Sequence, residues 1–255
     1  MNFRVVIPAR YGATRLPGKP LIVLAGKPLL QWVHERAHRS GAAQVLVATD
    51  DARIAAAARD FGAEVVMTAA THPSGTDRIA EVARLRGWNA GEIVVNVQGD
   101  EPLMPPELID QAAALLARHP QAHIATLAAP VPSLAAMLDP NMVKLVTDRD
   151  GRALYFSRAP IPWHRDGAAA GTDGVVHQQQ YAGARRHIGI YAYRVGALLE
   201  LTALPPSPLE LAEKLEQLRA LENGMDIRVA ESCVAPGPDV NSPEDVVRVA
   251  AMLQR

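Results

Sequence analysis

The sequence predicts an α/β fold, in which a mainly parallel β-sheet carries helices on both faces and a β-rich portion follows in the second half. Three observations predict it. Apolar segments rich in β-branched residues alternate with helical patterns over about the first 130 residues. Such runs are typical of parallel strands that are covered on both faces. A hairpin pattern follows, and 255 residues with 49% hydrophobic content are enough to bury one large core.

The first half contains predicted strands and helices in strict alternation. We expect strands at 4–8, 44–50, 63–68, 92–102 (running into a loop) and 123–131. Between them we expect helices at 27–41, 51–62, 75–87 and 105–120. Prolines near the helix starts and glycines at the stops support these boundaries. In sheets of this kind, ligands bind beyond the carboxyl ends of the strands.

The second half has a different pattern. Residues 141–158 predict a β-hairpin that turns at Asp150-Gly151. A polar stretch rich in glycine and alanine, 164–184, is expected to be a mobile loop. A strand at 186–194, one helix at 207–224, a strand at 226–232 and a last helix from Pro243 complete the chain.

The bulk properties exclude several classes of protein. The net charge is −1 and the pI about 6.7, which argues against a surface that coats nucleic acid. Cys233 is the only cysteine, so no internal disulfide can form and a reducing compartment is expected. Pro8 and Arg10 interrupt the apolar N-terminal run, which therefore does not resemble a signal peptide. No apolar stretch approaches ~20 residues, so we expect a cytoplasmic protein without a membrane span.

The stretch "RYGATRLPGKP" consists of Arg10 and residues 11–20. It places three cations, Arg10, Arg15 and Lys19, after the first strand. It is not a P-loop, because five residues separate its glycines and Pro20 follows Lys19. Glycines allow a backbone to approach an anion, and Arg15 and Lys19 can clamp phosphate oxygens. A solvated surface turn is the alternative on composition alone.

The stretch "VNVQGDEP" ends a predicted buried strand in Asp100 and Glu101. Carboxylates in such a place suit Mg²⁺, which takes oxygen ligands and bridges substrate phosphates. An acidic helix cap is the plainer interpretation. The cationic loop at the same sheet edge favours the metal, because cations hold a polyphosphate while an aspartate holds its metal.

Two further stretches are candidates whose local patterns fit plain capping loops equally well. In "HPSGTDR", Ser74, Gly75 and Thr76 stand at a helix start, where free N–H groups can bind a base or phosphate. In "PGPDVNSPED", Asp239 and Asn241 precede the last helix, where Asp and Asn favour turns. The eight histidines show no spacing typical of zinc ligands, and no G-x-S-x-G elbow is present.

Together these stretches closely resemble the 3-deoxy-manno-octulosonate cytidylyltransferases, the CMP-Kdo synthetases of bacterial lipopolysaccharide synthesis. The segments that carry the resemblance occur in family order along essentially the whole chain: "IPARYGATRLPGKPL", "VATDD", "HPSGTDRIAEV", "VNVQGDEP", "ALYFSRAPIPW", "RHIGIYAYR", "SPLELAEKLEQLR" and "SPEDV". The resemblance implies a Rossmann-like nucleotide-diphospho-sugar transferase fold and a homodimer. It also implies transfer of CMP from CTP to 3-deoxy-D-manno-octulosonate (Kdo), with Mg²⁺ and release of pyrophosphate.

The resemblance also implies an organisation of the chain. Residues 1–255 would form a single domain, with a nucleotide-binding part at about 1–130 and a sugar-binding and dimerisation part at about 131–225. Residues 226–255 would return to the main sheet.

Site residues follow from the resemblance as well. The triphosphate would be held by Arg10, Arg15 and Lys19, of which Arg10 and Lys19 are catalytic together with the metal ligand Asp100. The nucleotide would be placed by Pro8, Ala9, Ser74, Gly75, Thr76 and Arg78. The Kdo pocket would be lined by Gln98, Arg158, His187, Tyr191, Glu210 and Gln217.

One position departs from the family pattern. The family usually has an aspartate directly before the turn that opens the last helix, as a second metal-binding carboxylate, and here that position is Asn241. We expect Asn241 to be the direct ligand, with Asp239 beside it. The alternatives are an enzyme for a related acidic sugar (an 8-amino-Kdo or a sialic acid) and a non-catalytic nucleotide-binding protein. Retention of Lys19, Asp100 and Arg158 together argues against the non-catalytic alternative.

Overall fold

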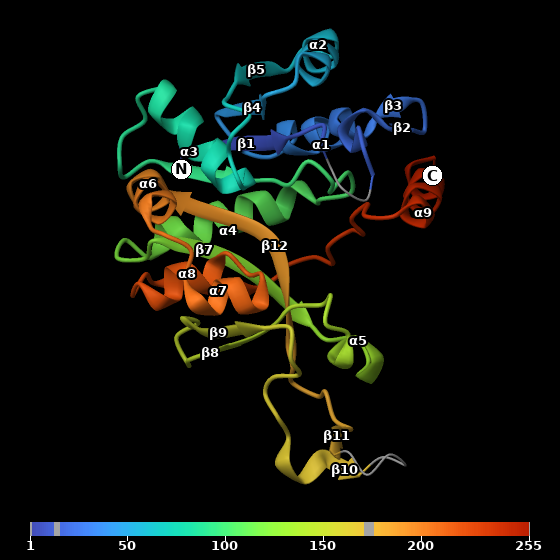
Figure 1. The fold of residues 1–255 in the computed structure, drawn as a ribbon, viewed down its shortest axis with the longest axis vertical. Coiled ribbons are helices and arrows are strands. Elements are labelled where there is room, and N and C mark those ends of the chain that lie inside the picture. Colours follow the sequence, from blue (N-terminus) through green and yellow to red (C-terminus); the bar gives the residue numbers. More distant parts are fainter. Residues whose placement is uncertain (1, 13–15, 171–175, 255) are drawn as a thin grey trace.

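The computed structural model describes residues 2–12, 16–170 and 176–254. Within these residues the main sheet has nine strands, seven of them in the order β13-β7-β12-β6-β1-β4-β5, with β8 attached to β12 and β9 attached to β8 (Figure 1). The seven are β1 (Phe3–Ala9), β4 (Gln44–Thr49), β5 (Glu64–Met67), β6 (Ile93–Asn96), β7 (Ile124–Pro130), β12 (Arg185–Arg194) and β13 (Ile227–Glu231).

The sheet is mainly parallel, as predicted, and is interrupted by one antiparallel strand. β1 pairs in parallel with β4 and β6, β4 with β5, and β13 with β7. β12 runs antiparallel between β6 and β7. Its register against β7 shifts between Ile188 and Tyr191. This ten-residue strand pairs with β7 on both sides of the shift, with β6 at its C-terminal end and with β8 at its N-terminal end. The antiparallel insertion was not predicted.

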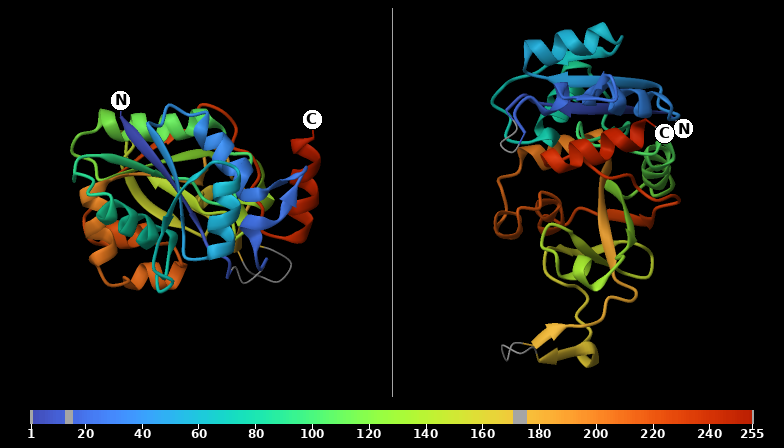
Figure 2. Two further views of the ribbon diagram at one scale, coloured as in Figure 1. Left: turned by 90° about the horizontal axis from the view of Figure 1, so that it is seen from above. Right: turned by 90° about the vertical axis from the view of Figure 1, so that its right-hand side faces the viewer.

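Helices cover both faces of the sheet, which confirms the predicted layers (Figure 2). Alternate residues of β1 face opposite sides: Val5 and Ile7 belong to one buried cluster and Val6 to the other. The first cluster includes α1 (Leu29–His38), α2 (Ala52–Asp60), α4 (Pro106–Arg118) and α9 (Pro243–Leu253). The second includes α3 (Gly75–Leu85), α6 (Val195–Ala203) and α8 (Gln217–Glu222). The described chain forms no helix with the length and apolarity that a bilayer crossing requires.

The second half contains the predicted hairpin, formed by β8 (Lys144–Thr147) and β9 (Ala153–Ser157). The predicted plain loop over 164–184 is wrong in part. A 3₁₀ turn, η2 (Arg165–Gly167), leads into β10 (Ala168–Ala170), which pairs with β11 (Val176–Gln178). This small hairpin lies at the end of a long excursion away from the main sheet (Figure 2).

The single helix predicted over 207–224 is also wrong. It is two short helices, α7 (Pro208–Glu213) and α8, separated by Lys214 in the left-handed conformation (φ 54°). The carboxylate of Glu213, next to the break, accepts hydrogen bonds from the Ser157 hydroxyl (2.6 Å) and the Arg158 N–H (2.9 Å). These contacts tie the end of α7 to the segment after β9, and local helical patterning carries no information on such tertiary contacts. α6, α5 (Leu134–Leu138), η1 (Lys19–Leu21), β2 (Val23–Leu24) and β3 (Lys27–Pro28) were not predicted.

Candidate active site

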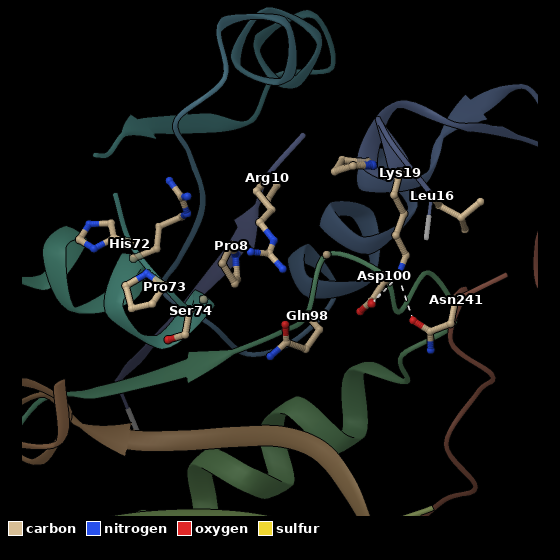
Figure 3. Close-up of a pocket in the computed structure, with 15 residues that line it drawn as sticks. Pro8, Arg10, Leu16, Lys19, His72, Pro73, Ser74, Gln98, Asp100 and Asn241 are labelled. Carbon is tan, nitrogen blue, oxygen red and sulfur yellow. Dashed lines mark hydrogen bonds and ion pairs between the residues drawn. The ribbon is translucent and has the colours of Figure 1, made fainter. Parts of the chain in front are cut away.

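The loops that follow β1, β5 and β6 converge on a cavity of about 550 Å³, as expected for the carboxyl edge of a parallel sheet (Figure 3). We call it the first cavity. Its walls include most of the residues to which nucleotide and metal roles were assigned: Pro8, Ala9, Arg10, Lys19, Ser74, Gly75, Arg78, Asp100 and Asn241. Gln98, which was assigned to the Kdo pocket, also lines it. Leu16, Pro20, His72, Pro73 and Gly99 complete it. Arg15, the remaining member of the predicted triphosphate group, lies outside the described residues.

Lys19 reaches this cavity because the cationic loop folds back on itself. Gly18 adopts a left-handed conformation (φ 70°), and its N–H donates to the Tyr11 carbonyl at 2.9 Å. A Cβ at Gly18 would lie 3.1 Å from the Tyr11 ring, so a side chain there would be both strained and crowded. The chain then enters η1 and directs the Lys19 ammonium at the Asp100 carboxylate, 2.6 Å away (Figure 3).

Asp100 and Asn241 are brought together from opposite ends of the sequence. A Cβ at Gly99 would lie 2.9 Å from the Pro8 carbonyl, so only glycine lets the β6 loop pass this close to the end of β1. On the other side, the Val240 N–H donates to the Asp100 carbonyl at 3.0 Å and fixes the segment before α9. The Asn241 amide oxygen then lies 3.1 Å from the Lys19 ammonium.

Asp239 lies outside this contact. Its side chain is exposed and accepts a hydrogen bond from the Asn241 amide nitrogen. That bond turns the Asn241 amide oxygen toward Lys19 and Asp100. The geometry therefore places Asn241 in the inner position and Asp239 behind it.

The arrangement fits a divalent cation. Asp100 and Asn241 present oxygens that share one cationic partner, the Lys19 ammonium. Next to them, the Oε2 atom of Glu101 is buried without a partner among the described residues. Burial, and then the nearby Asp100 and Asp239 carboxylates, raise the pKa of Glu101 well above its ordinary value. The described residues contain no group of three or more His, Cys, Asp or Glu that could hold an ion, and Mg²⁺ commonly uses few protein ligands and takes the rest from phosphates.

The other end of the first cavity is formed by the start of α3. Ser74 caps this helix: its hydroxyl accepts from the Asp77 N–H at 3.2 Å and donates to the Asp77 carboxylate at 2.7 Å. Arg78 is buried; its guanidinium pairs with Asp50 at 3.1 Å and also bonds the Thr68 hydroxyl. Arg78 therefore ties the loops after β4 and β5 together while it lines the cavity.

A second cavity of about 240 Å³ adjoins the first and shares Ser74, Gly75 and Gln98 with it. It lies between β6, β12 and the break between α7 and α8, and it is lined by Thr76, Asn96, Ile124, Tyr191, Tyr193, Leu201, Glu216 and Gln217 as well. The Tyr191 hydroxyl and the Asn96 Oδ1 atom are buried and find no partner among the described residues. Burial raises the pKa of Tyr191 well above its ordinary value, so the hydroxyl stays protonated. Unpaired buried polar groups are costly, and a ligand rich in hydroxyl groups would satisfy them.

Comparison with known proteins agrees with this architecture. A family model described as Cytidylyltransferase matches residues 4–227. A 3-deoxy-manno-octulosonate cytidylyltransferase of Pseudomonas syringae pv. tomato is 56% identical over 252 residues, 99% of this chain and 98% of the relative. One of Thioalkalivibrio sulfidiphilus is 54% identical over 254 residues, 100% of both chains. The chain belongs to the 3-deoxy-manno-octulosonate cytidylyltransferase family.

Solved structures show the same relationship. The structure of a CMP:2-keto-3-deoxy-manno-octonic acid synthetase complexed with CTP superposes with a TM-score of 0.86 at 40% identity, covering 99% of this chain and 98% of the other. A cytidylyltransferase from Leptospira borgpetersenii, 16% identical with a TM-score of 0.61, covers 99% of this chain and 86% of the other. At that identity the second likeness concerns the fold alone.

Three residues that the cytidylyltransferase resemblance assigned to the Kdo pocket do not line either of these cavities. The Arg158 guanidinium donates to the carbonyls of Glu213 (2.6 Å) and Pro140 (2.8 Å). Glu210 accepts two hydrogen bonds from Arg219, at 2.6 and 2.7 Å, which lower its pKa. In the structure, therefore, neither the Arg158 nor the Glu210 side chain lines the second cavity.

His187 is the third of these residues, and it lies behind the cavity wall. Its ring packs against Phe156 and Tyr191, and Nε2 lies 2.9 Å from the Thr126 hydroxyl. Burial lowers the pKa of His187 to about 3, so the ring is neutral at physiological pH. His187 thus supports Tyr191, which does line the cavity together with the other assigned residues Gln98 and Gln217.

Sequence reasoning missed the apolar Ile124 and Leu201 of the second cavity and three polar residues: Asn96, Tyr193 and Glu216. Asn96 is a polar residue in an otherwise apolar buried strand, and Tyr193 shares a strand face with Tyr191, so both carried a usable signal. Glu216 carried none, because it follows the unpredicted helix break. Burial raises its pKa, and the neighbouring Thr76 and Ser74 side chains partly offset that shift.

Proposed function

We propose that this chain transfers CMP from CTP to Kdo, giving CMP-Kdo and pyrophosphate for lipopolysaccharide synthesis. One observation carries the proposal. A cavity edged by Lys19, Arg10 and Asp100 adjoins a second cavity whose walls carry several polar side chains, and the two share Ser74, Gly75 and Gln98. Such a pair of adjoining sites suits a reaction between a nucleoside triphosphate and a polyhydroxylated acid. The names of the family members describe a cytidylyltransferase for such an acid.

The first cavity would hold CTP along its length. The triphosphate belongs at the end occupied by Lys19 and Arg10, where two cations line the wall. The base then falls at the opposite end, beside Pro73 and Ser74 at the start of α3 (Figure 3). Lys19 stabilises the negative charge that builds on the phosphates during transfer.

Asp100 and Asn241 are the residues that would hold Mg²⁺, with phosphate oxygens completing its ligands. When bound there, the metal supplies polarisation of the α-phosphate and lowers the pKa of the attacking sugar hydroxyl. Asp239 keeps the Asn241 amide oriented through its hydrogen bond. Lys19 and Arg10 offset the repulsion between two anionic substrates.

The second cavity would hold the sugar. Its attacking hydroxyl must reach the α-phosphorus, and Gln98, which lies between Ser74 and Asp100 (Figure 3), belongs to the wall that the two cavities share. Tyr191, Gln217 and Glu216 offer donors and acceptors to the remaining hydroxyls. Arg158 would then act by fixing the loop before α8 through the Glu213 carbonyl.

A homodimer remains part of the proposal. The portion after residue 130 exposes large apolar side chains, among them Leu154 (59% exposed) and Trp163 (49%). Exposed apolar side chains of this size suit a surface that another chain covers. A cytoplasmic location remains a prediction from the sequence. The molar mass measured by light scattering tests the dimer, and a monomer at micromolar concentration would contradict it.

Pyrophosphate release tests the reaction. With CTP and Kdo we expect release that depends on both substrates and on Mg²⁺, whereas CTP alone should give none. The matched arms replace Kdo by an 8-amino-Kdo analogue or a sialic acid, and CTP by UTP. Faster release with one of the other sugars would move the substrate assignment to that sugar, and no release with any would contradict the catalytic role.

A further inference from the structure

Lys19 occupies the position that the divalent cation would take. Its ammonium lies 2.6 Å from Asp100 Oδ2 and 3.1 Å from Asn241 Oδ1, which are the two oxygens assigned to the metal (Figure 3). The contact is partly shielded from water, since the Lys19 side chain is only 14% exposed and that of Asp100 32%. The Lys19 ammonium therefore contacts both of the protein oxygens that the divalent cation would use.

Both cations cannot use these oxygens together. Asp100 supplies a single negative charge, and Asn241 is neutral where the family usually has a second carboxylate. An ammonium and a divalent ion held by the same two oxygens would repel each other at short range, where screening by solvent is weak. Metal entry thus requires the Lys19 ammonium to leave.

We propose that Lys19 is a built-in competitor of the divalent cation, which keeps the metal site closed until a triphosphate draws the ammonium away. The inference rests on the metal site assigned under the proposed function. It predicts a binding order for this chain: the metal binds weakly to the free protein and tightly once phosphate oxygens offer Lys19 a new partner.

The local backbone allows this exchange without rearrangement. The turn that carries Lys19 is fixed by hydrogen bonds from the Lys19 N–H to the Leu16 carbonyl (3.1 Å) and from the Leu21 N–H to the Gly18 carbonyl (2.8 Å). Its four-carbon side chain is flexible and ends in a compact charge. The cavity of about 550 Å³ beside it leaves room for the ammonium to swing from Asp100 toward a bound phosphate.

Binding of Mn²⁺ to the nucleotide-free protein, followed by electron paramagnetic resonance, tests the proposal without any turnover. Lys19→Met should bind Mn²⁺ at least about fivefold more tightly than the unmodified protein, since the competing ion pair is gone. Arg10→Met is the matched control, because Arg10 lines the same cavity while no contact of its guanidinium with Asp100 or Asn241 is found among the described residues. Unchanged or weaker binding by Lys19→Met, or equal tightening by Arg10→Met, would overturn the competition.

Two further measurements distinguish a failure of the Lys19 competition from a failure of the proposed metal site on which it rests. Adding a CTP analogue with a methylene bridge between the α and β phosphorus atoms should tighten Mn²⁺ binding more in the unmodified protein than in Lys19→Met. Asp100→Asn should weaken Mn²⁺ binding both with and without the CTP analogue. If Asp100→Asn binds normally, the metal site itself is misplaced; if it weakens binding while Lys19→Met does not tighten it, only the competition fails. Thermal melting checks that the variants fold, and Lys19→Gln replaces Lys19→Met if that variant does not.

Discussion

The two cavities of this protein are built in different ways. The first is formed by loops at the ends of β1, β5 and β6, and each loop contributes a short run of neighbouring residues such as Ser74 and Gly75. The second is formed by side chains that project from within β6 and β12, and from the break between α7 and α8. Nucleotide recognition therefore depends on short contiguous motifs, whereas the proposed sugar site depends on packing.

Their electrostatics differ as well. The first cavity brings Lys19, Arg10 and Asp100 to its walls and is suited to phosphates and a metal. In the second, burial raises the pKa values of Tyr191 and Glu216 and leaves uncharged hydroxyl and amide groups around them. A charged site beside a shielded hydrogen-bonding site is a sensible division for an anionic nucleotide and a polyhydroxylated acid.

The largest effect should come from the first cavity. Asp100→Ala should lower kcat by about a hundredfold to a thousandfold, because the metal and Lys19 lose their charged partner together. The fold should persist, since Asp100 lies in a loop and its side chain is 32% exposed. Steady-state kinetics at saturating Mg²⁺ check the loss, with Asp239→Ala as the matched control. A rate near that of the unmodified protein would remove the metal role.

A pH experiment examines the wall behind the second cavity. Burial holds the pKa of His187 at about 3 against an ordinary 6.5, so between these values the unfolded chain binds more protons. The free energy of unfolding contributed by His187 therefore falls as pH drops below 6.5, by about 2 kcal/mol between pH 8 and pH 5. His187→Gln removes the titration and keeps a partner for Thr126. Urea unfolding of both proteins at the two pH values measures the difference, and parallel losses would show that the ring is not enclosed.

The two cavities could not be predicted from the sequence equally well. Several residues of the first cavity, among them Lys19, Ser74 and Asp100, could be singled out from the sequence, because each stands in a short strand-end motif. The family resemblance added most of the others. Glu216 was missed because its position depends on the left-handed Lys214, which breaks an otherwise regular helical pattern. The antiparallel β12 was also missed, since strand periodicity carries no information on direction or on neighbours. Tertiary contacts decide both features.

A smaller effect distinguishes two glutamates of the second half. Glu216→Gln should raise the KM for Kdo about tenfold and leave the KM for CTP nearly unchanged, because an amide donor replaces one of the two carboxylate acceptors in the second cavity. Glu210→Gln is the matched control: its carboxylate pairs with Arg219, so we expect a loss of stability with less change in KM. Kinetics with each substrate varied, together with thermal melting, separate the two outcomes. The opposite pattern would return Glu210 to the sugar pocket.

The smallest effect concerns Asn241, where metal affinity and competition by Lys19 act in opposite directions. Asn241→Asp adds a charge that attracts Mg²⁺ and the Lys19 ammonium alike, so the nucleotide-free protein should gain little metal affinity. With CTP bound, Lys19 has phosphate partners, and the Mg²⁺ concentration for half-maximal rate should fall about threefold. Asn241→Ala should impair turnover more than Asp239→Ala, because the Asn241 oxygen faces Lys19 while Asp239 lies behind it. Metal titrations of the three variants decide the matter, and a larger defect for Asp239→Ala would make Asp239 the ligand and Asn241 its support.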